Sequence, residues 1–312
     1  MAVCDLGTFS ALMLIARNSN DRWRIIADER HTVDLLAKVS KNKNITDRSV
    51  HDLARAMNRF QSLADSAGSD AGAVVCTAAF RDAPNREKVL QRLRRETRYP
   101  IKVLSAREEA LYGISGARIG LRPSDGPQIM IDIGGGSTEI VRETRGRLTV
   151  HGVNCGAARA TKEWQAKRPR NRHARSAFFR EQAARTMQTI SAASFSKTCH
   201  LIGVGGTIVT LACIFLGLRE FDPRRLHGRV LKRRWVSEMA VTLSLLDRAE
   251  IAALIPFDAR RARVLTAGTF LWTAVLDRCD ADQVTVSVRG LRWGVAARLA
   301  SSRRPDFHPR QL

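Results

Sequence analysis

Two pairs of short apolar runs, each pair split by a glycine-containing turn, give this chain its clearest pattern. Residues 2–6 and 11–17 are apolar on either side of a turn with Gly7, and residues 131–141 form a similar pair around Gly134. Short apolar runs bounded by turn residues are typical of buried strands. Because a strand resumes directly after each turn, both places predict a β-hairpin. The hairpins lie about half a chain apart, which predicts two similar halves.

Strand and helix patterns alternate through the rest of each half. Residues 50–63 carry apolar side chains at helical spacing, with Thr46 placed to cap that helix. Further strands are expected at residues 23–28, 73–77, 101–104, 146–150, 201–204 and 283–288. Further helices are expected to start near residues 85, 105 and 208, and to span 237–246, 262–276 and 290–300. This alternation predicts an α/β fold.

A break in the pattern divides the halves. Residues 120–127 contain glycine, proline and serine without periodicity, which is typical of a hinge between domains. We therefore expect a first domain of residues 1–122, joined by a C-terminal helix at 297–312, and a second domain of residues 123–296.

The composition is that of an ordinary globular protein. The chain has 312 residues, of which 44% are hydrophobic, and this length suffices for two domains. No apolar run is long enough for a transmembrane helix, and a strand pattern begins where a signal peptide would stand, so we expect a cytoplasmic protein. The six cysteines are scattered without a CxxC pair, which predicts buried thiols rather than zinc or disulfides.

The formal net charge of +22 is the unusual value. Such a charge attracts polyanions, including nucleic acid, acidic membranes, polyphosphate and highly phosphorylated nucleotides. The basic segments are not interleaved with aromatic residues, so a base-stacking groove is not indicated, and neither nucleic acid nor membrane is expected as the specific partner. Residues 162–185 and 224–234 are the most basic segments. They are either solvated surface or a surface that guides a polyanion.

The second turn carries the strongest chemical signal, in the segment Ile-Asp-Ile-Gly-Gly-Gly-Ser-Thr-Glu-Ile-Val of residues 131–141. Glycines leave the backbone N–H groups open to an anion, whereas a hairpin alone needs fewer of them. The candidate phosphate ligands are Gly134, Gly135, Gly136 and Ser137. Asp132 and Glu139 flank the turn, where their oxygens could hold Mg²⁺.

A third glycine turn follows the strand at 201–204. Here a helix comes next, and a helix N-terminus favours an anion. A structural turn would also use glycine, although it would not need as many. The candidate phosphate ligands in this turn are Gly205, Gly206 and Thr207.

Two adjacent glutamates near residue 108 are expected to differ in role. Ser105 and Glu108 fit a capping box, which gives Glu108 a structural function. Glu109 has no such function and lies in the first turn of a helix that leaves a strand end. Active-site residues of open α/β sheets collect at that position.

Together these segments resemble the exopolyphosphatase/guanosine-pentaphosphate phosphohydrolase (Ppx/GppA) family. The resemblance covers nearly the whole chain, in its short two-domain form. It implies two RNase H-like domains, as in the actin/Hsp70/sugar-kinase superfamily, with a cleft between them. The matching segments are residues 5–10, 77–83, 104–110, 131–139 and 203–207.

The resemblance implies Mg²⁺-dependent hydrolysis of a terminal phosphoanhydride. Glu109 aligns with the catalytic glutamate, which would hold and activate the attacking water. Arg81 aligns with the arginine that faces the phosphate, although a surface salt bridge is an alternative role. The expected phosphate ligands of the first hairpin are Thr8 and Ser10. The expected metal ligands are Asp132 and Glu139, with Asp5 as a candidate from the other half.

The expected substrate is inorganic polyphosphate, and the expected assembly is a homodimer. Guanosine pentaphosphate is the alternative substrate. A sensor that binds polyphosphate or an alarmone without turnover is a second possibility, favoured by departures from the family pattern at Phe9, Val288 and Trp293. A nucleic-acid-binding protein rests on charge alone. A sugar or acetate kinase is disfavoured, because Glu109 in its motif indicates water as the acceptor.

Overall fold

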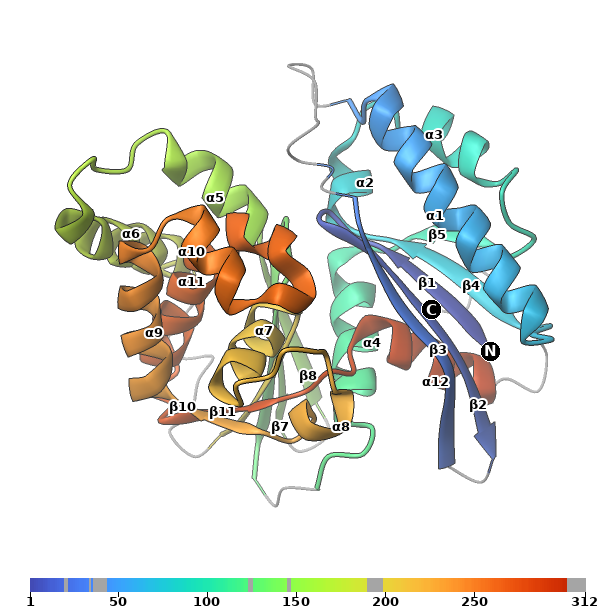
Figure 1. Cartoon of the computed structure of the whole chain (residues 1–312). Coiled ribbons are helices and arrows are strands. Elements are labelled where there is room, and N and C mark those ends of the chain that lie inside the picture. The colour runs from blue at the N-terminus through green and yellow to red at the C-terminus, as the bar shows by residue number, and fades with distance from the viewer. Residues whose placement is uncertain are drawn as a thin grey trace. The chain divides into compact units, whose positions relative to one another are not determined.

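The computed structural model describes residues 1–19, 22–33, 35, 44–122, 126–144, 147–189 and 199–301 (Figure 1). It divides into two compact units, Met1–Gly116 with Gly290–Leu312 and Ala117–Arg289. The sequence had indicated boundaries after residues 122 and 296. The predicted hinge at 120–127 and the predicted helix at 297–312 lie partly outside the described residues.

Unit 1 is built on a sheet with strand order β3-β2-β1-β4-β5. The first three strands form antiparallel pairs, and β4 and β5 continue in parallel from β1. The strands are β1 (Ala2–Leu6), β2 (Ser10–Ser19), β3 (Arg22–Thr32), β4 (Gly72–Cys76) and β5 (Ile101–Val103). The helices are α1 (Asp47–Ser66), α2 (Ala78–Asp82), α3 (Arg86–Leu93), α12 (Leu291–Ser301) and most of α4 (Ala106–Arg118).

Unit 2 repeats this plan with one added strand, in the order β10-β11-β9-β6-β7-β8. Its strands are β6 (Gln128–Ile133), β7 (Thr138–Thr144), β8 (Arg147–Val153), β9 (His200–Val204), β10 (Val230–Lys232) and β11 (Gln283–Val286). Its helices are α5 (Ala157–Gln165), α6 (Arg172–Met187), α7 (Gly206–Phe215), α8 (Pro223–Leu226), α9 (Arg233–Leu245), α10 (Arg248–Leu254), the 3₁₀ segment η3 (Pro256–Arg263) and α11 (Leu265–Arg278).

The two sheets share one topology. Strands β8-β7-β6-β9-β11 of unit 2 correspond in order and direction to β3-β2-β1-β4-β5 of unit 1. This is the RNase H-like order, so the predicted α/β class with two such domains is confirmed. The expectation of two similar halves, each beginning with a hairpin, is confirmed with it.

Helix starts follow from the capping residues in the sequence. The side chain of Thr46 accepts a hydrogen bond from the N–H of Ser49 at the start of α1. At α4, the backbone N–H of Glu108 donates to Ser105 Oγ at 3.2 Å, and the N–H of Ser105 donates to Glu108 Oε2 at 2.8 Å. The predicted capping box is therefore present. Glu108, and not the adjacent Glu109, supplies its carboxylate.

Helix α12 belongs to the core of unit 1. Trp293 is 1% exposed, and its ring meets Trp23 edge-on with 5.4 Å between centroids. Arg292 donates to the backbone carbonyl of Met13 at 3.1 Å and pairs with Asp28 of β3. These contacts explain why the whole of α12 stays with unit 1, although the predicted boundary at residue 296 would have divided it. They also place Trp293 in the core.

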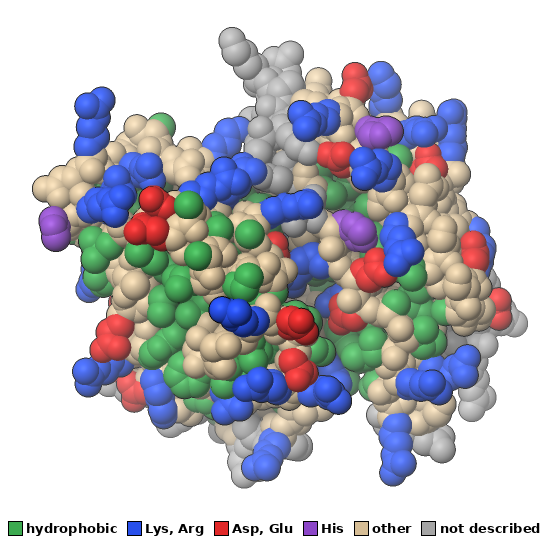
Figure 2. Space-filling model, in the orientation of Figure 1, with side chains coloured by type: hydrophobic (Ala, Val, Ile, Leu, Met, Phe, Trp, Pro, Cys, Tyr) green, Lys and Arg blue, Asp and Glu red, His purple; other side chains and the backbone are tan. Residues whose placement is uncertain are grey.

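The charge and the cysteines can be located on the structure. Figure 2 shows Lys and Arg side chains scattered over the face in view, and they do not gather into a single stripe. All six cysteines are free thiols, and five of them are buried. In the described part of the chain, no helix is both long and apolar enough to cross a membrane.

The close approach of α12 to α4 gives a test of this packing. A Cβ at Gly294 would lie 2.0 Å from the carbonyl oxygen of Tyr112, a backbone atom that cannot move without its helix. We expect Gly294→Ala to lower the free energy of unfolding by about 1–3 kcal/mol, the usual cost of overpacking. Chemical denaturation measures this loss. The control Ser115→Ala, at an exposed position of α4, should change the free energy of unfolding little. Equal stability of the two variants would contradict the close packing of α12 against α4.

Candidate active site

The first hairpin turn, residues 7–10, is closed by its own backbone. The N–H of Gly7 donates to the carbonyl of Ser10 at 3.0 Å, and the carbonyl of Thr8 accepts from the N–H of Leu35 at 2.8 Å. Thr8 is buried, and Ser10 is partly exposed. Phe9 is also buried, with 6% exposure. The Phe9 ring, one of the departures from the family pattern, is thus withdrawn from solvent.

The second hairpin turn, residues 134–137, is closed in the same way. The N–H of Gly134 donates to the carbonyl of Ser137 at 3.0 Å. Helix α5 starts on this turn, because the N–H groups of Ala157 and Ala158 donate to the carbonyls of Gly134 and Gly135 at 2.8 and 2.9 Å. These bonds fix the turn to the first turn of the helix.

This arrangement leaves the amide groups of the second turn available. Within the described part of the chain, no residue accepts a hydrogen bond from the N–H groups of Gly135, Gly136 or Ser137. Gly156 permits the close packing behind them, since a Cβ there would lie 2.5 Å from the carbonyl oxygen of Gly134. Consecutive N–H groups without internal acceptors form a concavity suited to an anion.

Two carboxylates flank the second turn, at paired positions of its two strands. Asp132 of β6 lies directly opposite Glu139 of β7 in the antiparallel register. Glu139 is 2% exposed, and like charges in directly opposed positions of a sheet repel each other. In the first hairpin, the residue opposite Asp5 is Leu12, so that hairpin has no such pair.

This donor set fits Mg²⁺. Mg²⁺ takes oxygen ligands and is usually held by one or two carboxylates, with phosphate oxygens and water completing the shell. Asp132 and Glu139 supply such a pair. Asp5 lies in the other unit, and among the described residues no three His, Cys, Asp or Glu side chains gather as a cluster that could hold a metal.

The third turn lies beside the second one. Gly205 has a φ of +90°, and a Cβ there would lie 2.5 Å from Asp132 Oδ1. The carboxylate of Asp132 therefore rests against the start of α7, whose N-terminus carries a partial positive charge. Thr207 is 2% exposed and packs against Gly268.

Arg261 is a further residue of this turn that the sequence analysis missed. A Cβ at Gly206 would lie 2.0 Å from both terminal nitrogens of Arg261, so the guanidinium group covers that glycine. Arg261 is 7% exposed and pairs with Asp258 at 3.0 Å. Its only signal in the sequence was its place in a short basic run, which did not connect it to a turn more than fifty residues earlier.

In unit 1, Arg81 and Glu109 form an ion pair. Arg81 lies in α2 after β4, and Glu109 lies in α4 after β5, so both follow neighbouring parallel strands. Nη1 of Arg81 donates to Glu109 Oε2 at 2.5 Å and to the carbonyl of Leu104 at 3.0 Å. The side chains are only 22% and 13% exposed, which distinguishes this pair from a surface salt bridge.

The surroundings of Glu109 change its acidity. Burial raises the pKa of this carboxyl above its ordinary value, and the charge and hydrogen bond of Arg81 oppose that increase. Glu108 has different partners, since it caps α4 and pairs with Lys102 at 2.7 Å. Of the two adjacent glutamates, Glu109 is therefore the one whose raised pKa suits proton transfer.

The first hairpin and this ion pair are connected within unit 1. The N–H of Thr77, which precedes α2, donates to the carbonyl of Leu6 at 3.2 Å. A Cβ at Gly7 would lie 3.9 Å from Thr77 Oγ1. The structure therefore brings the first turn next to the helix that carries Arg81, and it brings the second and third turns together around Asp132 in unit 2.

Comparisons with known proteins agree with this picture. A model of the Ppx/GppA phosphatase family matches residues 14–303. The bifunctional 3-dehydroquinate synthase/phosphatase of Fusobacterium nucleatum is 24% identical over 92% of this chain, which spans 44% of that protein. Exopolyphosphatase 2 of Mycobacterium tuberculosis is 24% identical, and the match covers 96% of this chain and 98% of that protein. The guanosine-5'-triphosphate,3'-diphosphate pyrophosphatase of Vibrio vulnificus is 25% identical, and the match covers 98% of this chain and 60% of that protein.

Solved structures extend the agreement to the fold. The PPX-GPPA enzyme of Aquifex aeolicus is 26% identical with a TM-score of 0.78, covering 95% of this chain and 98% of that one. An exopolyphosphatase of Cytophaga hutchinsonii has a TM-score of 0.82 at 21% identity, covering 97% and 98%. The predicted class of phosphoanhydride hydrolases is confirmed at the level of the family. With its motifs, its topology and the match over most of its length, the chain belongs to the Ppx/GppA phosphatase family.

Proposed function

We propose that this protein is a Mg²⁺-dependent exopolyphosphatase, which hydrolyses the terminal phosphate of inorganic polyphosphate. The observation that carries the proposal is the largely buried pair of Arg81 and Glu109, with the pKa of the glutamate raised by burial. The names of relatives such as exopolyphosphatase 2 of Mycobacterium tuberculosis support the substrate. The net charge of +22 supports a long polyanion.

Glu109 is the proposed general base. A carboxyl whose pKa is raised toward neutrality accepts a proton more readily from an attacking water than an ordinary glutamate does. Arg81 fixes the orientation of this carboxylate through Nη1, and its remaining N–H groups can donate to oxygens of the terminal phosphoryl group. Water held in line with the leaving oxygen is what phosphoryl transfer to water requires.

The glycine turns are the proposed phosphate ligands. The N–H groups of residues 135–137 and the N-terminus of α7 donate to phosphate oxygens, and Arg261 adds a positive charge beside Gly206. Thr8 and Ser10 supply hydroxyl groups from the first hairpin. Donors that are already oriented stabilise the charge that develops on the leaving phosphate without a cost of reorganisation.

Asp132 and Glu139 would hold Mg²⁺, with Asp5 as a candidate from unit 1. When bound, the ion neutralises phosphate charge and polarises the bond that breaks. Gly205 keeps Asp132 in place, because only a residue without a side chain leaves room for that carboxylate.

Guanosine pentaphosphate is the second candidate substrate, favoured by the similarity to the pyrophosphatase of Vibrio vulnificus. The rates of phosphate release from the two substrates distinguish these functions. The sensor hypothesis loses part of its support, because Phe9 and Trp293 are both buried and neither ring is displayed as a ligand contact.

The adjacent glutamates provide a matched test of the proposed base. Glu109→Gln keeps the shape of the side chain but cannot take a proton, so we expect phosphate release from polyphosphate to fall by about 100-fold or more. Glu108→Gln retains a capping side chain and should release phosphate at close to the wild-type rate. Unchanged turnover in Glu109→Gln would refute the assigned base.

The pH dependence tests the pairing with Arg81. Glu109 acts when deprotonated, so activity falls as the pH drops through its raised pKa. Arg81 lowers that pKa, and Arg81→Gln should therefore move the acidic limb of the rate profile to higher pH, besides lowering the rate. Lys102→Gln, which removes the partner of Glu108, should leave the limb in place. A limb that does not move in Arg81→Gln would exclude Glu109 as the titrating group.

Gly205→Ala tests the support of Asp132. The new Cβ would push against Asp132 Oδ1, in a backbone region that is essentially reserved for glycine. We expect a higher Mg²⁺ concentration for half-maximal activity, together with a loss of stability of about 1–3 kcal/mol. Gly217→Ala is the control, since Gly217 also has a positive φ but has no neighbouring atom within 4 Å. An equal Mg²⁺ requirement in both variants would contradict the role of Asp132.

A further inference from the structure

An arginine-lined pocket in unit 2 has no part in the site described above. It has a volume of about 340 Å³, within the range of ligand-binding cavities. Helices α5, α6, α9, α10 and α11 contribute to its wall, together with η3 and the segment between α5 and α6. Its charged lining residues are Arg168, Arg172, Arg175, Arg248, Arg263 and Asp247.

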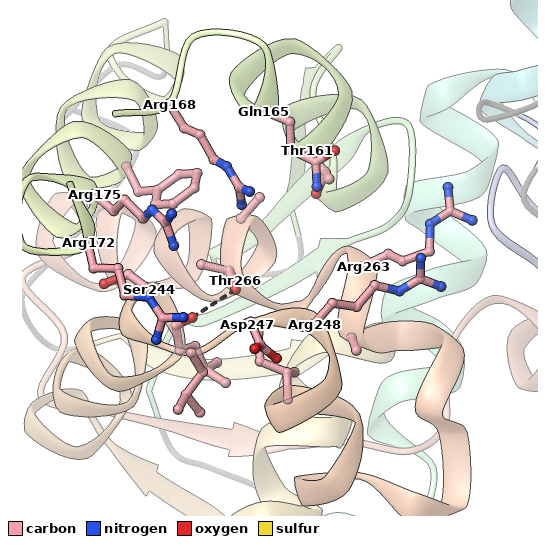
Figure 3. Close-up of a pocket in the computed structure, with 16 residues that line it drawn as sticks. Thr161, Gln165, Arg168, Arg172, Arg175, Ser244, Asp247, Arg248, Arg263 and Thr266 are labelled. Atoms are coloured by element: carbon pink, nitrogen blue, oxygen red, sulfur yellow. Dashed lines mark hydrogen bonds between the residues drawn. The ribbon is translucent and has the colours of Figure 1, made fainter. Parts of the chain in front are cut away.

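The arginines occupy two opposite sides of the pocket. Figure 3 shows Arg168, Arg172 and Arg175 on one side, and Arg248 and Arg263 on the other. Thr266 lies between them, its hydroxyl and that of Ser244 both donate to backbone carbonyls of α9, and the apolar lining residues are largely buried. A ligand in this pocket therefore meets positive charge at both ends.

Two of the five arginines, Arg168 and Arg248, are not neutralised by the described part of the chain. Asp247 is committed to capping α10, where it accepts from the N–H groups of Ala249 and Glu250. No described residue forms a hydrogen bond or ion pair with the side chain of Arg168 or Arg248. A bound anion would relieve the mutual repulsion of such a cluster.

The remaining two arginines on the first side are also weakly compensated. Arg172 reaches Glu250 only at 3.9 Å, in an exposed pair of the kind that contributes little. Arg175 donates to the backbone carbonyl of Pro169 at 3.2 Å. Burial and the charges of Arg168 and Arg172 lower the pKa of Arg175, which reports the crowding of positive charge.

The pocket adjoins the glycine turns inside the same unit. Helix α5 starts on the second turn at Ala157, and its residues Thr161 and Gln165 line the pocket about 6 and 12 Å further along the helix axis. On η3, Arg261 covers Gly206 while Arg263 lines the pocket. A chain of phosphates that ends at the turns could thus continue toward the arginines.

We propose that this pocket is a distal subsite, which binds oligophosphate groups remote from the bond that is broken. A guanidinium group can bind two phosphate oxygens at once. Five such groups on two sides of the pocket suit a linear anion with charge along its length. This inference rests on the proposed function. A phosphorylated nucleotide shares the same chemistry, and the experiment below separates the two sources.

The experiment removes charge from both sides of the pocket. The variant Arg168→Gln with Arg248→Gln takes away two arginines that hold no described partner. The control variant Arg180→Gln with Arg225→Gln removes the same charge from exposed positions of unit 2 outside the pocket. We expect the pocket variant to raise the KM for long-chain polyphosphate by about tenfold or more relative to the control, as loss of charged hydrogen bonds does. The KM for tripolyphosphate should rise much less, and kcat for long chains should follow the control.

Titration calorimetry with long-chain polyphosphate gives a readout that does not need turnover. Weaker binding by the pocket variant than by the control supports the subsite, even if the wild-type protein releases no phosphate and the proposed function fails. Equal affinity and equal KM in the pocket and control variants would overturn the subsite. A parallel titration with guanosine pentaphosphate completes the test, since a loss confined to the nucleotide would overturn the assignment to oligophosphate.

Discussion

The structure depends on one backbone hydrogen bond that occurs twice. In each unit, the N–H of a glycine donates to the carbonyl of a serine three residues later, from Gly7 to Ser10 and from Gly134 to Ser137. This bond turns the first strand directly into the second, so the third strand and the parallel strands can assemble around the pair. In unit 2 the same turn also anchors α5 through its carbonyls, while its remaining amides have no acceptor among the described residues.

The two units have diverged in chemistry on this common plan. Unit 2 places a carboxylate opposite the aspartate of its hairpin, whereas unit 1 has Leu12 at that position. Unit 1 instead holds Arg81 and Glu109, at the ends of neighbouring parallel strands. The first unit therefore carries the group suited to move a proton, and the second carries the groups suited to bind phosphate and a cation.

Local rules made much of this predictable from the sequence. Turn glycines and short apolar runs predicted the hairpins, and the capping-box pattern distinguished Glu108 from Glu109, as the hydrogen bonds at α4 confirm. Long-range packing was not predictable in the same way. Arg261 reaches Gly206 only because η3 folds back onto the third turn, and Trp293 is buried because α12 returns to the first sheet. The roles of the individual site residues stay predictions.

Hydrolysis of long-chain polyphosphate in oxygen-18 water, with Mg²⁺ present, tests the account most directly. If Glu109 delivers water to a terminal phosphate held by the glycine turns, the protein releases orthophosphate that carries a single oxygen-18 atom. Release should also stop when Mg²⁺ is chelated if Asp132 and Glu139 hold the cation as proposed. Tight binding of polyphosphate without release at any Mg²⁺ concentration, or release of unlabelled phosphate, would contradict the account.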